Sequence, residues 1–398
     1  MSALKLVTLE EAQRAAVSAG SRRTLELIEL PIEEAVGRVV AEPVFSGSDV
    51  PGVDRAALDG FATKFEFLER RDGGGAVRLK LSESPGDGPW AVSVLTGQPI
   101  PPGSDVVIRT EHVKLEGQKL VFRGMAERWE NVERRGSFFR AGDRVVERGE
   151  LLRPPQVAVL SELGVRRVSV YRRPRCAVIS VGGELLSESG RAIPNDYAHV
   201  VASYLRQMGC DVTSIEAVGD EVDGLVGRVK GAAETNDLVV TVGRASSGSN
   251  DVVRKAYAEM EGAEVLFHGV RLHPGKPVGL VMVRERSWLI LPGSLTAAIA
   301  GLHLIGAPYL RSLYRLRSPP PELAAGLDGD APGRPGVSSV YFASLEPSGE
   351  GVRAKVLPKG VNNLYTASRA NAFLVVPPGA HATFGEAVKL TLLGRLTY

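Results

Sequence analysis

The chain has 398 residues, of which 44% are hydrophobic and 24% are charged. At about 150 residues per domain, this length predicts two or three domains, and the apolar content suffices for a core in each, which excludes a disordered chain. The formal net charge is only +2, so we expect neither a nucleic acid nor a membrane as the main partner.

Long apolar stretches and cysteines are both scarce. The longest apolar stretch, from about Leu295 to Leu310, is shorter than the ~20 residues that a membrane span needs. The first residues lack the apolar block of a secretory signal, and we therefore expect a cytoplasmic protein. The two cysteines, Cys176 and Cys210, form no Cys-x-x-Cys pair. This excludes a disulfide framework and a cysteine-rich zinc site, and both thiols are expected to be buried.

The first part of the chain predicts two helices and then a small β domain. Thr8 to Glu11 has the pattern of a capping box, ahead of a helix to about Ser18. A second helix is expected from Pro31 to Val40, because proline suits the first helical position. From Phe45 to about Val146, short alternating runs lie between Gly, Pro and Asp turns, which indicates a small β domain.

A short connecting region follows this β domain. It has the pattern of a helix over 151–163 and of a strand over 168–171. The basic cluster of Arg172, Arg173 and Arg175 comes next and is interpreted as a solvated hinge.

From Cys176 the sequence alternates between strand and helix patterns, which predicts a doubly wound α/β domain. The expected elements are strand 176–181, a helix with Val200 to Met208 on one face, strand 213–218, helix 222–233, strand 237–242, helix 252–260, strand 288–291 and a last helix to about Leu313. A linker over 318–336 then precedes a tail of short strands, which predicts a C-terminal all-β domain.

The loops that follow the parallel strands are expected to carry the chemistry, because they meet at the carboxyl edge of the sheet. Glycines in these loops let backbone N–H groups approach an anion, and the next helix adds partial positive charge. The loop 243–248, with Gly243, Arg244, Ser246 and Gly248, is the best candidate for a phosphate or an oxyanion. The other three loops contribute Gly182, Gly183 and Glu184, Gly219 and Asp220, and Pro292, Gly293 and Ser294.

Three carboxylates in these loops, Glu184, Asp220 and Asp251, favour a hard cation such as Mg²⁺, which bridges oxygen ligands and phosphate. The alternative is that Asp220 and Asp251 are helix caps, since each stands immediately before a helix. The pattern of neither a Walker phosphate loop nor a Gly-x-Gly-x-x-Gly fingerprint occurs here, which disfavours an ordinary NTPase or dehydrogenase.

His273 to Lys276 forms a tight turn whose lysine is suited to neutralising a phosphate or an oxyanion. The alternative is an ordinary exposed turn lysine. The six histidines show no metal-ligand spacing, and no serine–histidine pair lies on a nucleophile elbow, so covalent catalysis is not predicted.

Several motifs in this order resemble the molybdopterin molybdenumtransferase family, which comprises the MoeA proteins and the gephyrin E domain. Residues 54–62 resemble the family's Ser-Ala-Met-Asp-Gly-Tyr-Ala signature, and 96–103 resemble its Thr-Gly-Ala-Pro-x-Pro-x-Gly. Residues 182–185 stand where the family has Gly-Asp-Glu-Leu, and 274–277 and 291–293 also match.

The resemblance implies a homodimer of four-part subunits, with a cleft between the α/β domain of one subunit and the small β domain of the other. The domains would be 1–47 with 137–172 as an elongated linker domain, 48–136 as the small β domain, 173–317 as the molybdopterin-binding α/β domain and 318–398 as a β-barrel-like domain. The implied reaction takes adenylylated molybdopterin and molybdate or tungstate, hydrolyses the adenylate with Mg²⁺ and releases AMP. A molybdopterin adenylyltransferase is a further partner that this reaction suggests.

Site residues carried over by the resemblance fall into two groups. The catalytic positions are Asp59, Thr96, Glu184, Asp220, Asp251 and Lys276, of which Asp59 and Thr96 would come from across the dimer and the three α/β carboxylates would hold the metal. The positions expected to bind the pterin and oxyanion substrates are Gly182, Gly243, Arg244, Ser246, Gly248, His273, Pro292, Gly293 and Ser294.

The chain departs from the family pattern in the same loops. Gly183 replaces an aspartate, Arg244 a glycine and His273 a lysine. The remaining changes are Ser137 and Phe138 for Glu-Asp, Tyr197 for asparagine, and Ser294 and Leu295 for Asn-Pro. Arg244 and His273 would then supply positive charge that the family obtains from backbone amides and lysine.

Three hypotheses follow. The leading one is a divergent metal-insertion transferase that acts by electrostatic positioning. The second is a molybdopterin-binding or assembly protein that keeps the scaffold and the dimer without turnover. The third is an enzyme that uses the same pocket on a different nucleotide-linked anion.

Overall fold

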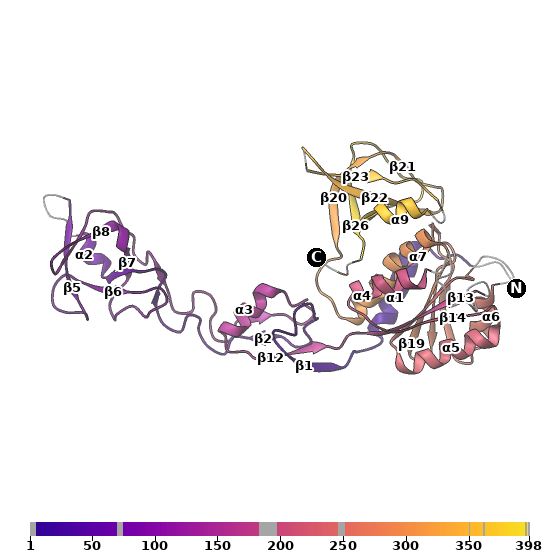
Figure 1. Ribbon diagram of the computed structural model, residues 1–398, viewed down its shortest axis with the longest axis horizontal. Helices are drawn as coiled ribbons and strands as arrows, with labels where there is room; N and C mark the ends of the chain where they lie inside the picture. The colour runs from indigo at the N-terminus through magenta and orange to yellow at the C-terminus, as the bar shows by residue number, and fades with distance from the viewer. Residues whose placement is uncertain are drawn as a thin grey trace, which may run out of the picture. The chain divides into compact units, whose positions relative to one another are not determined.

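The computed structural model describes residues 5–69, 75–182, 197–245, 251–349, 351–360, 363–394 and 396. Its contacts divide the chain into two compact units (Figure 1). The larger unit comprises Met1–Glu42, Arg148–Arg153 and Ser169–Tyr398, and the smaller unit comprises Pro43–Glu147 and Pro154–Val168. The division into four domains stays a prediction.

The smaller unit is built on a six-stranded sheet, as the turn-rich sequence predicts. Its strand order is β7-β4-β6-β5-β9-β8. The strands are β4 (Gly60–Thr63), β5 (Val77–Ser82), β6 (Trp90–Val94), β7 (Val106–Arg109), β8 (Val113–Glu116) and β9 (Lys119–Phe122). One face buries Leu79, Leu120 and Phe122. The rest consists of the pairs β2 (Val44–Phe45) with β11 (Arg144–Val146) and β3 (Arg55–Ala56) with β10 (Val132–Glu133), the helices α2 (Phe65–Glu69) and α3 (Pro154–Glu162), and a 3₁₀ turn over Thr110–His112.

The larger unit begins with helix α1 (Leu9–Ser21), and the predicted capping box is confirmed. The Thr8 hydroxyl accepts the Glu11 N–H at 3.2 Å, and the Thr8 N–H donates to the Glu11 carboxylate at 2.7 Å. These contacts satisfy two of the N–H groups that a helix start leaves unpaired.

The predicted helix over 31–40 is wrong. The segment is strand β1 (Leu27–Pro31), which pairs with β12 (Arg167–Tyr171), followed by turns. Gly37 has a φ of +74° and donates its N–H to Leu152 O, and Val40 N–H donates to Glu150 O. Backbone pairing with residues distant in the sequence therefore overrides the local helical pattern.

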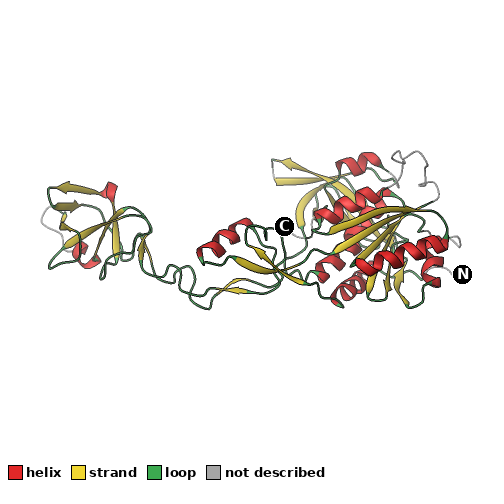
Figure 2. Ribbon diagram, turned by 60° about the horizontal axis from the view of Figure 1, so that its bottom comes forward, coloured by secondary structure: helices red, strands yellow, loops and turns green. Residues whose placement is uncertain are grey.

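The centre of the larger unit is a six-stranded sheet of order β14-β13-β15-β19-β18-β16 (Figure 2). The first four strands are parallel, which confirms the doubly wound α/β prediction, and β18 and β16 add an antiparallel edge. The strands are β13 (Arg175–Val181), β14 (Asp211–Val218), β15 (Leu238–Val242), β16 (Ala263–His268), β18 (Gly279–Val283) and β19 (Arg286–Leu291). Of these, β16 escaped the sequence prediction.

Helices cover both faces of this sheet. Because successive strand residues point to opposite faces, Val240 of β15 packs with one layer and Val239 with the other. The first layer contains α1, α4 (Ala198–Gln207), α7 (Leu295–Gly301), a π-helical turn over Leu302–Gly306 and α8 (Ala307–Leu313). The second contains α5 (Val222–Thr235) and α6 (Val252–Glu259). Cys176 and Cys210 are buried free thiols, as expected.

The C-terminal part forms a closed five-stranded barrel, which confirms the β-barrel-like prediction. The ring runs β22-β23-β20-β26-β24, closed by pairing of β22 with β24, and the short strand β17 (Leu272–His273) joins it beside β22. Its strands are β20 (Glu322–Asp328), β22 (Ser338–Ser348), β23 (Gly351–Val356), β24 (Ala372–Val376) and β26 (Ala387–Leu392). The pair β21 (Ala331–Pro332) with β25 (His381–Ala382) and helix α9 (Leu364–Arg369) complete it.

Two expectations for this region need correction. The predicted linker over 318–336 contains β20 and β21, and the tail is not all β, because it contains α9. Among the described residues, no helix combines the length and apolarity that crossing a membrane requires.

Candidate functional site

The crevice between β13 and β15 is the point where the strand order of the α/β sheet reverses, since the chain places β14 on one side of β13 and β15 on the other. Ligands of such sheets bind at this point, beyond the carboxyl ends of the strands. Gly182 follows β13, Gly243 follows β15, and Pro292, Gly293 and Ser294 follow β19. Asp220, after β14, lies 2.8 Å from Arg244 of the β15 loop, so the structure brings residues of all four predicted loops to this edge.

Gly243 is required by close backbone packing. Its φ is +109°, and a Cβ atom there would lie 2.5 Å from Val181 O. A Cβ on Gly293 would lie 3.2 Å from the Gly243 Cα. The Gly182 N–H donates to Val218 O at 3.0 Å, and the Gly243 N–H donates to Leu291 O at 3.1 Å. These two N–H groups are already paired within the sheet, so they are not available to an anion.

Asp220 and Arg244 form an ion pair at this edge. The Arg244 Nε is 2.8 Å from Asp220 Oδ1, and both side chains are about two-fifths exposed, at 41% and 43%. Arg244 has a φ of +46°, in the left-handed region that favours glycine. Asp220 does not cap helix α5, whose N-cap is Glu221 without a side-chain cap bond. The positive charge expected from Arg244 thus lies beside a carboxylate that we expected to bind a cation.

Asp251 is buried and caps helix α6. Its Oδ1 accepts the Arg254 N–H at 3.0 Å, as the helix-cap alternative predicts. Its Oδ2 lies 4.0 Å from the Nε2 of His268, on β16, and the two side chains are 1% and 2% exposed. The His268 Nε2 has no hydrogen-bond partner within the described part of the chain, and its Nδ1 is 3.0 Å from the Tyr257 hydroxyl. Burial lowers the pKa of His268, which keeps the ring neutral beside Asp251 at pH 7.

Lys276 and His273 have different surroundings, although one tight turn contains both. Lys276 is exposed, and its backbone carbonyl accepts the Val270 N–H. His273 is half-buried and belongs to β17, beside Ser339 of β22. Burial, followed by the charges of Arg334 and Lys359, lowers the pKa of His273.

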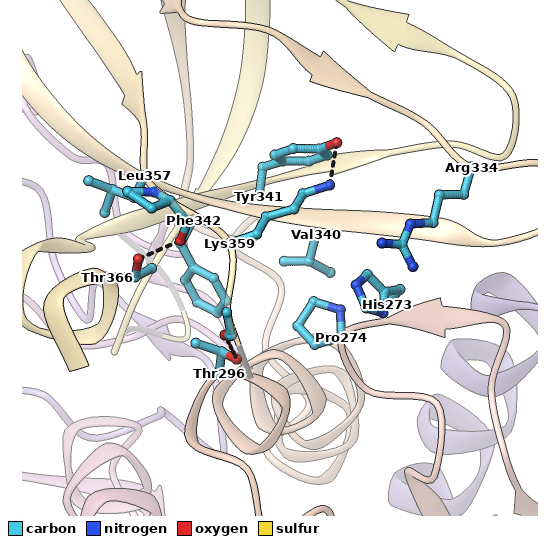
Figure 3. Close-up of a pocket in the computed structure, with 12 residues that line it drawn as sticks. His273, Pro274, Thr296, Arg334, Val340, Tyr341, Phe342, Leu357, Lys359 and Thr366 are labelled. Atoms are coloured by element: carbon cyan, nitrogen blue, oxygen red, sulfur yellow. Dashed lines mark hydrogen bonds between the residues drawn. The ribbon is translucent and has the colours of Figure 1, made fainter. Parts of the chain in front are cut away.

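A cavity of about 220 Å³ lies between this turn and the barrel, within the larger unit. We call it the cationic pocket. Figure 3 shows the Arg334 guanidinium directed toward the His273 ring, and Lys359 donating to the Tyr341 hydroxyl at 2.5 Å. The described lining contains no carboxylate and consists of His273, Pro274, Thr296, Arg334, Val340, Tyr341, Phe342, Leu357, Pro358, Lys359, Gly360 and Thr366.

The cationic pocket has apolar walls and a few fixed polar groups. Lys359 Nζ also lies 3.8 Å from the centre of the Tyr341 ring, so the ring and hydroxyl both hold the ammonium group in place. The Thr296 hydroxyl donates to Gly360 O at 3.1 Å, and the Thr366 hydroxyl donates to Pro358 O at 2.7 Å. Such a lining can bind a compact anion that displaces water from the pocket.

In the smaller unit, the structure brings Asp59 and Thr96 together. The Thr96 N–H and hydroxyl both donate to Asp59 Oδ1, each at 2.7 Å. These bonds, the backbone one first, hold the pKa of the exposed Asp59 carboxyl below its ordinary value. Asp59 is therefore ionised at neutral pH.

Three predicted site residues, Glu184, Ser246 and Gly248, lie outside the described residues. Within the described ranges no group of three or more His, Cys, Asp or Glu side chains is placed to hold a metal. Sequence reasoning also missed Arg334, Lys359 and His268. No local pattern identifies them, because the barrel and β16 place them beside the predicted loops only in the folded chain.

Comparisons with known proteins identify relatives over nearly the whole chain. The family model described as the MoeA N-terminal region (domain I and II) matches residues 7–164, and that of a probable molybdopterin binding domain matches residues 177–312. The molybdopterin molybdenumtransferase of Staphylococcus aureus (strain COL) is 26% identical over 385 residues, which cover 90% of this chain and 88% of that protein.

Two solved structures of a molybdopterin biosynthesis MoeA protein from Pyrococcus horikoshii have the same fold. One is 25% identical, with a TM-score of 0.81 over 98% of this chain and 100% of that chain. The other is 26% identical, with a TM-score of 0.75 over 98% and 99%. The two family models, the shared fold and the ordered motifs agree: the chain is a divergent member of the MoeA family.

Proposed function

We propose that the chain is a molybdopterin molybdenumtransferase that inserts molybdate or tungstate into adenylylated molybdopterin with Mg²⁺ and releases AMP. Its relatives support a role in molybdenum cofactor biosynthesis, because proteins similar over about nine-tenths of the chain have that name. The observation that carries the proposal is the cationic pocket, which lies at the turn that the sequence predicts for an oxyanion.

The chemistry of the cationic pocket supports a tetrahedral oxyanion as the substrate. Arg334 and Lys359 supply two permanent positive charges, and His273 gains a third when a bound dianion raises its pKa. A cavity of about 220 Å³ has room for a tetrahedral oxyanion together with water.

The glycine loops support a place for the phosphate end of the pterin. Gly182, Gly243 and Gly293 lie at the β13–β15 crevice, where the ligands of such sheets bind. The N-terminal turn of α7 follows Ser294, whose side chain makes no cap bond to that helix. We propose that this crevice binds the adenylylated phosphate while the cationic pocket binds the metal oxyanion.

The carboxylates proposed for Mg²⁺ do not form a cation site among the described residues. Asp220 is paired with Arg244, and Asp251 uses one oxygen for the α6 cap. A complete site requires Glu184 and the release of Arg244 from Asp220.

We propose a homodimer in which a second copy supplies Asp59 and Thr96. The Asp59–Thr96 pair supports this proposal, because two hydrogen bonds from Thr96 already orient the exposed Asp59 carboxylate. An orienting partner of this kind fixes a carboxylate for substrate binding at little further cost in side-chain entropy.

The decisive experiment supplies the full chain with adenylylated molybdopterin, Mg²⁺ and either molybdate or tungstate, and measures AMP release. We expect release that depends on the oxyanion. The double variant Arg334→Gln/Lys359→Gln should raise the KM for the oxyanion at least about tenfold, because two charge-assisted hydrogen bonds are lost. Arg353→Gln, on the exposed face of β23, is the matched control and should behave like the wild type. Absence of AMP with both oxyanions refutes the proposal.

The second candidate is a molybdopterin-binding or assembly protein without turnover. The Arg244–Asp220 ion pair favours it, since it neutralises one of the carboxylates that the reaction is expected to need. Calorimetry distinguishes the two candidates: pterin binding without AMP release in the presence of Mg²⁺ supports the binding protein.

A further inference from the structure

A second hollow lies at the opposite edge of the α/β sheet from the glycine loops. Its volume is about 460 Å³, and its lining includes Arg38, Arg172, Arg173, Arg175 and Arg206, which we call the arginine pocket. Arg175 is the first residue of β13, and Asp211, also in the lining, is the first residue of β14. Parallel strands begin at one edge of a sheet and end at the other, so the arginine pocket lies at the edge opposite the glycine loops. It shares no residue with the cationic pocket.

A buried carboxylate fixes the inner wall of the arginine pocket. Asp237 is 1% exposed, and Arg172 donates to its two oxygens at 2.6 and 2.9 Å. Its oxygens also accept the Arg175 N–H at 2.8 Å and lie within 3.3 Å of the guanidinium groups of Arg23 and Arg286. Asp237 is therefore shared among three guanidinium groups. It cannot neutralise Arg173, Arg175 and Arg206, which we call the outer arginines.

Three arginines of the lining face solvent. Arg173, Arg175 and Arg206 are exposed, and none of them makes an ion pair within the described part of the chain. Arg38 is half-buried, and its Nη2 donates to Tyr171 O at 2.9 Å. Burial, followed by the charge of Arg173, lowers the pKa of Arg38.

The charge balance of the arginine pocket is strongly positive. In the lining that the structure describes, Asp211 is the single acidic residue, against five arginines. Ile28, Val212 and Cys210 form the apolar remainder of the wall. An array of mutually repelling guanidinium groups around a hollow is stabilised by a ligand with several negative charges, which each planar fork can bind through two hydrogen bonds.

We propose that the arginine pocket binds a polyphosphate chain, either free or at the end of a nucleotide. A ligand with two or three linked phosphates has more oxygens for these guanidinium groups than a single oxyanion has. The proposal is independent of the function proposed above, since it concerns different residues at the opposite edge of the sheet. It also replaces the interpretation of Arg172, Arg173 and Arg175 as a solvated hinge.

Calorimetry on the full chain tests this assignment, with inorganic tripolyphosphate and ATP as separate probes in metal-free buffer of low ionic strength. We expect saturable binding that weakens as salt is added, because salt screens exposed charges. Tighter binding of ATP than of tripolyphosphate identifies a nucleotide as the ligand, and equal or weaker binding identifies the free polyphosphate.

Matched variants locate the binding. Arg173→Gln/Arg206→Gln removes two exposed arginines and should weaken binding at least about tenfold. Arg123→Gln/Arg353→Gln makes the same charge change at exposed positions after β9 and in β23, and should have no effect. Arg334→Gln should also have no effect, which separates this site from the cationic pocket.

Three results overturn the proposal. One is the absence of saturable binding of either probe to the wild type. Another is equal affinity in the Arg173→Gln/Arg206→Gln variant and the wild type. The third is preferential binding of an acidic peptide such as oligoglutamate, which assigns the surface to a protein partner instead.

Discussion

His273 illustrates how the surroundings of one residue set its charge. Burial and two neighbouring cations lower its pKa, so the ring is neutral above pH 7 in the absence of a ligand. A bound dianion favours the protonated ring and raises this pKa. We therefore predict that affinity for molybdate rises as the pH falls from 8 to 6, measured by calorimetry. His273→Lys, which restores the family's residue, should remove most of that dependence. Equal pH profiles in the two proteins would contradict this account.

Asp251 combines a structural and a proposed chemical role, and two substitutions separate them. Asn can still accept the Arg254 N–H at a helix N-cap, whereas Ala cannot. We predict that Asp251→Ala lowers the free energy of unfolding by about 1 kcal/mol in urea titrations, and that Asp251→Asn lowers it by less. AMP release should be lost in both variants, because both lack the carboxylate. Activity retained in Asp251→Asn would limit Asp251 to capping.

Arg244 stands in a left-handed conformation where the family has glycine. Arg244→Gly relieves roughly 1 kcal/mol of backbone strain and removes an exposed ion pair worth about 0–1 kcal/mol, so stability should be unchanged or slightly higher. It also frees Asp220. We predict that the variant needs less Mg²⁺ for half-maximal AMP release. A higher Mg²⁺ requirement would show that the Arg244 charge itself assists the substrate.

At the scale of elements, the contact between the loops after β13 and β15 depends on Gly243. Gly243→Ala places a Cβ 2.5 Å from Val181 O at a φ of +109°, and we predict a loss of about 3 kcal/mol of stability from overpacking and backbone strain. Gly231→Ala, in α5 with no atom within 4 Å of the new Cβ, is the control and should stabilise by about 1 kcal/mol. Urea unfolding of both variants checks this; a near-neutral Gly243→Ala would mean that the loops can separate.

The elements also show which parts of the fold can be predicted from local sequence patterns. Helices α4, α5 and α6 have their own apolar stripes and bounds close to the predicted ones. The 31–40 segment has a helical pattern too, yet Val40 N–H pairs with Glu150 O, a partner that no local pattern reveals. Strand β20 was missed for the same reason, since only pairing with the distant strands β23 and β26 defines it.

The candidate site follows the same division. Loops after parallel strands converge by topology, so Gly182, Gly243 and Gly293 could be predicted from strand order alone. Arg334 and Lys359 could not, because they reach the cationic pocket through the closure of the barrel. Asp251 was predicted as a ligand or as a cap, and the structure shows that it is at least a cap.

At the scale of the larger unit, His303 connects the α/β domain to the chain beyond the barrel. It lies in the π-helical turn, its Nδ1 is 2.8 Å from Ile299 O, and its Nε2 accepts the Gly394 N–H at 2.9 Å. Both nitrogens are therefore used by the neutral ring. Burial lowers the pKa of His303 to about 4, from an ordinary value of 6.5.

This pairing predicts an acid-sensitive fold. The unfolded chain binds a proton at His303 below pH 6.5, while the folded chain does so only near pH 4, so stability from this group is complete above pH 6.5 and is lost as the pH falls toward 4. The loss amounts to about 3 kcal/mol. His303→Gln, which has no titratable group, should flatten that part of the profile in urea unfolding at pH 7 and pH 4.5. Parallel profiles would assign the acid sensitivity to other groups.

The two-residue strand β17 connects the turn that contains Lys276 to the barrel. Leu272 and His273 hydrogen-bond beside β22 of the barrel, while Gly279, at the other end of the same short turn, begins β18 of the α/β sheet. Lys276 thus lies in a turn whose two ends belong to different sheets. The position of Lys276 therefore depends on the barrel as well as on the α/β sheet.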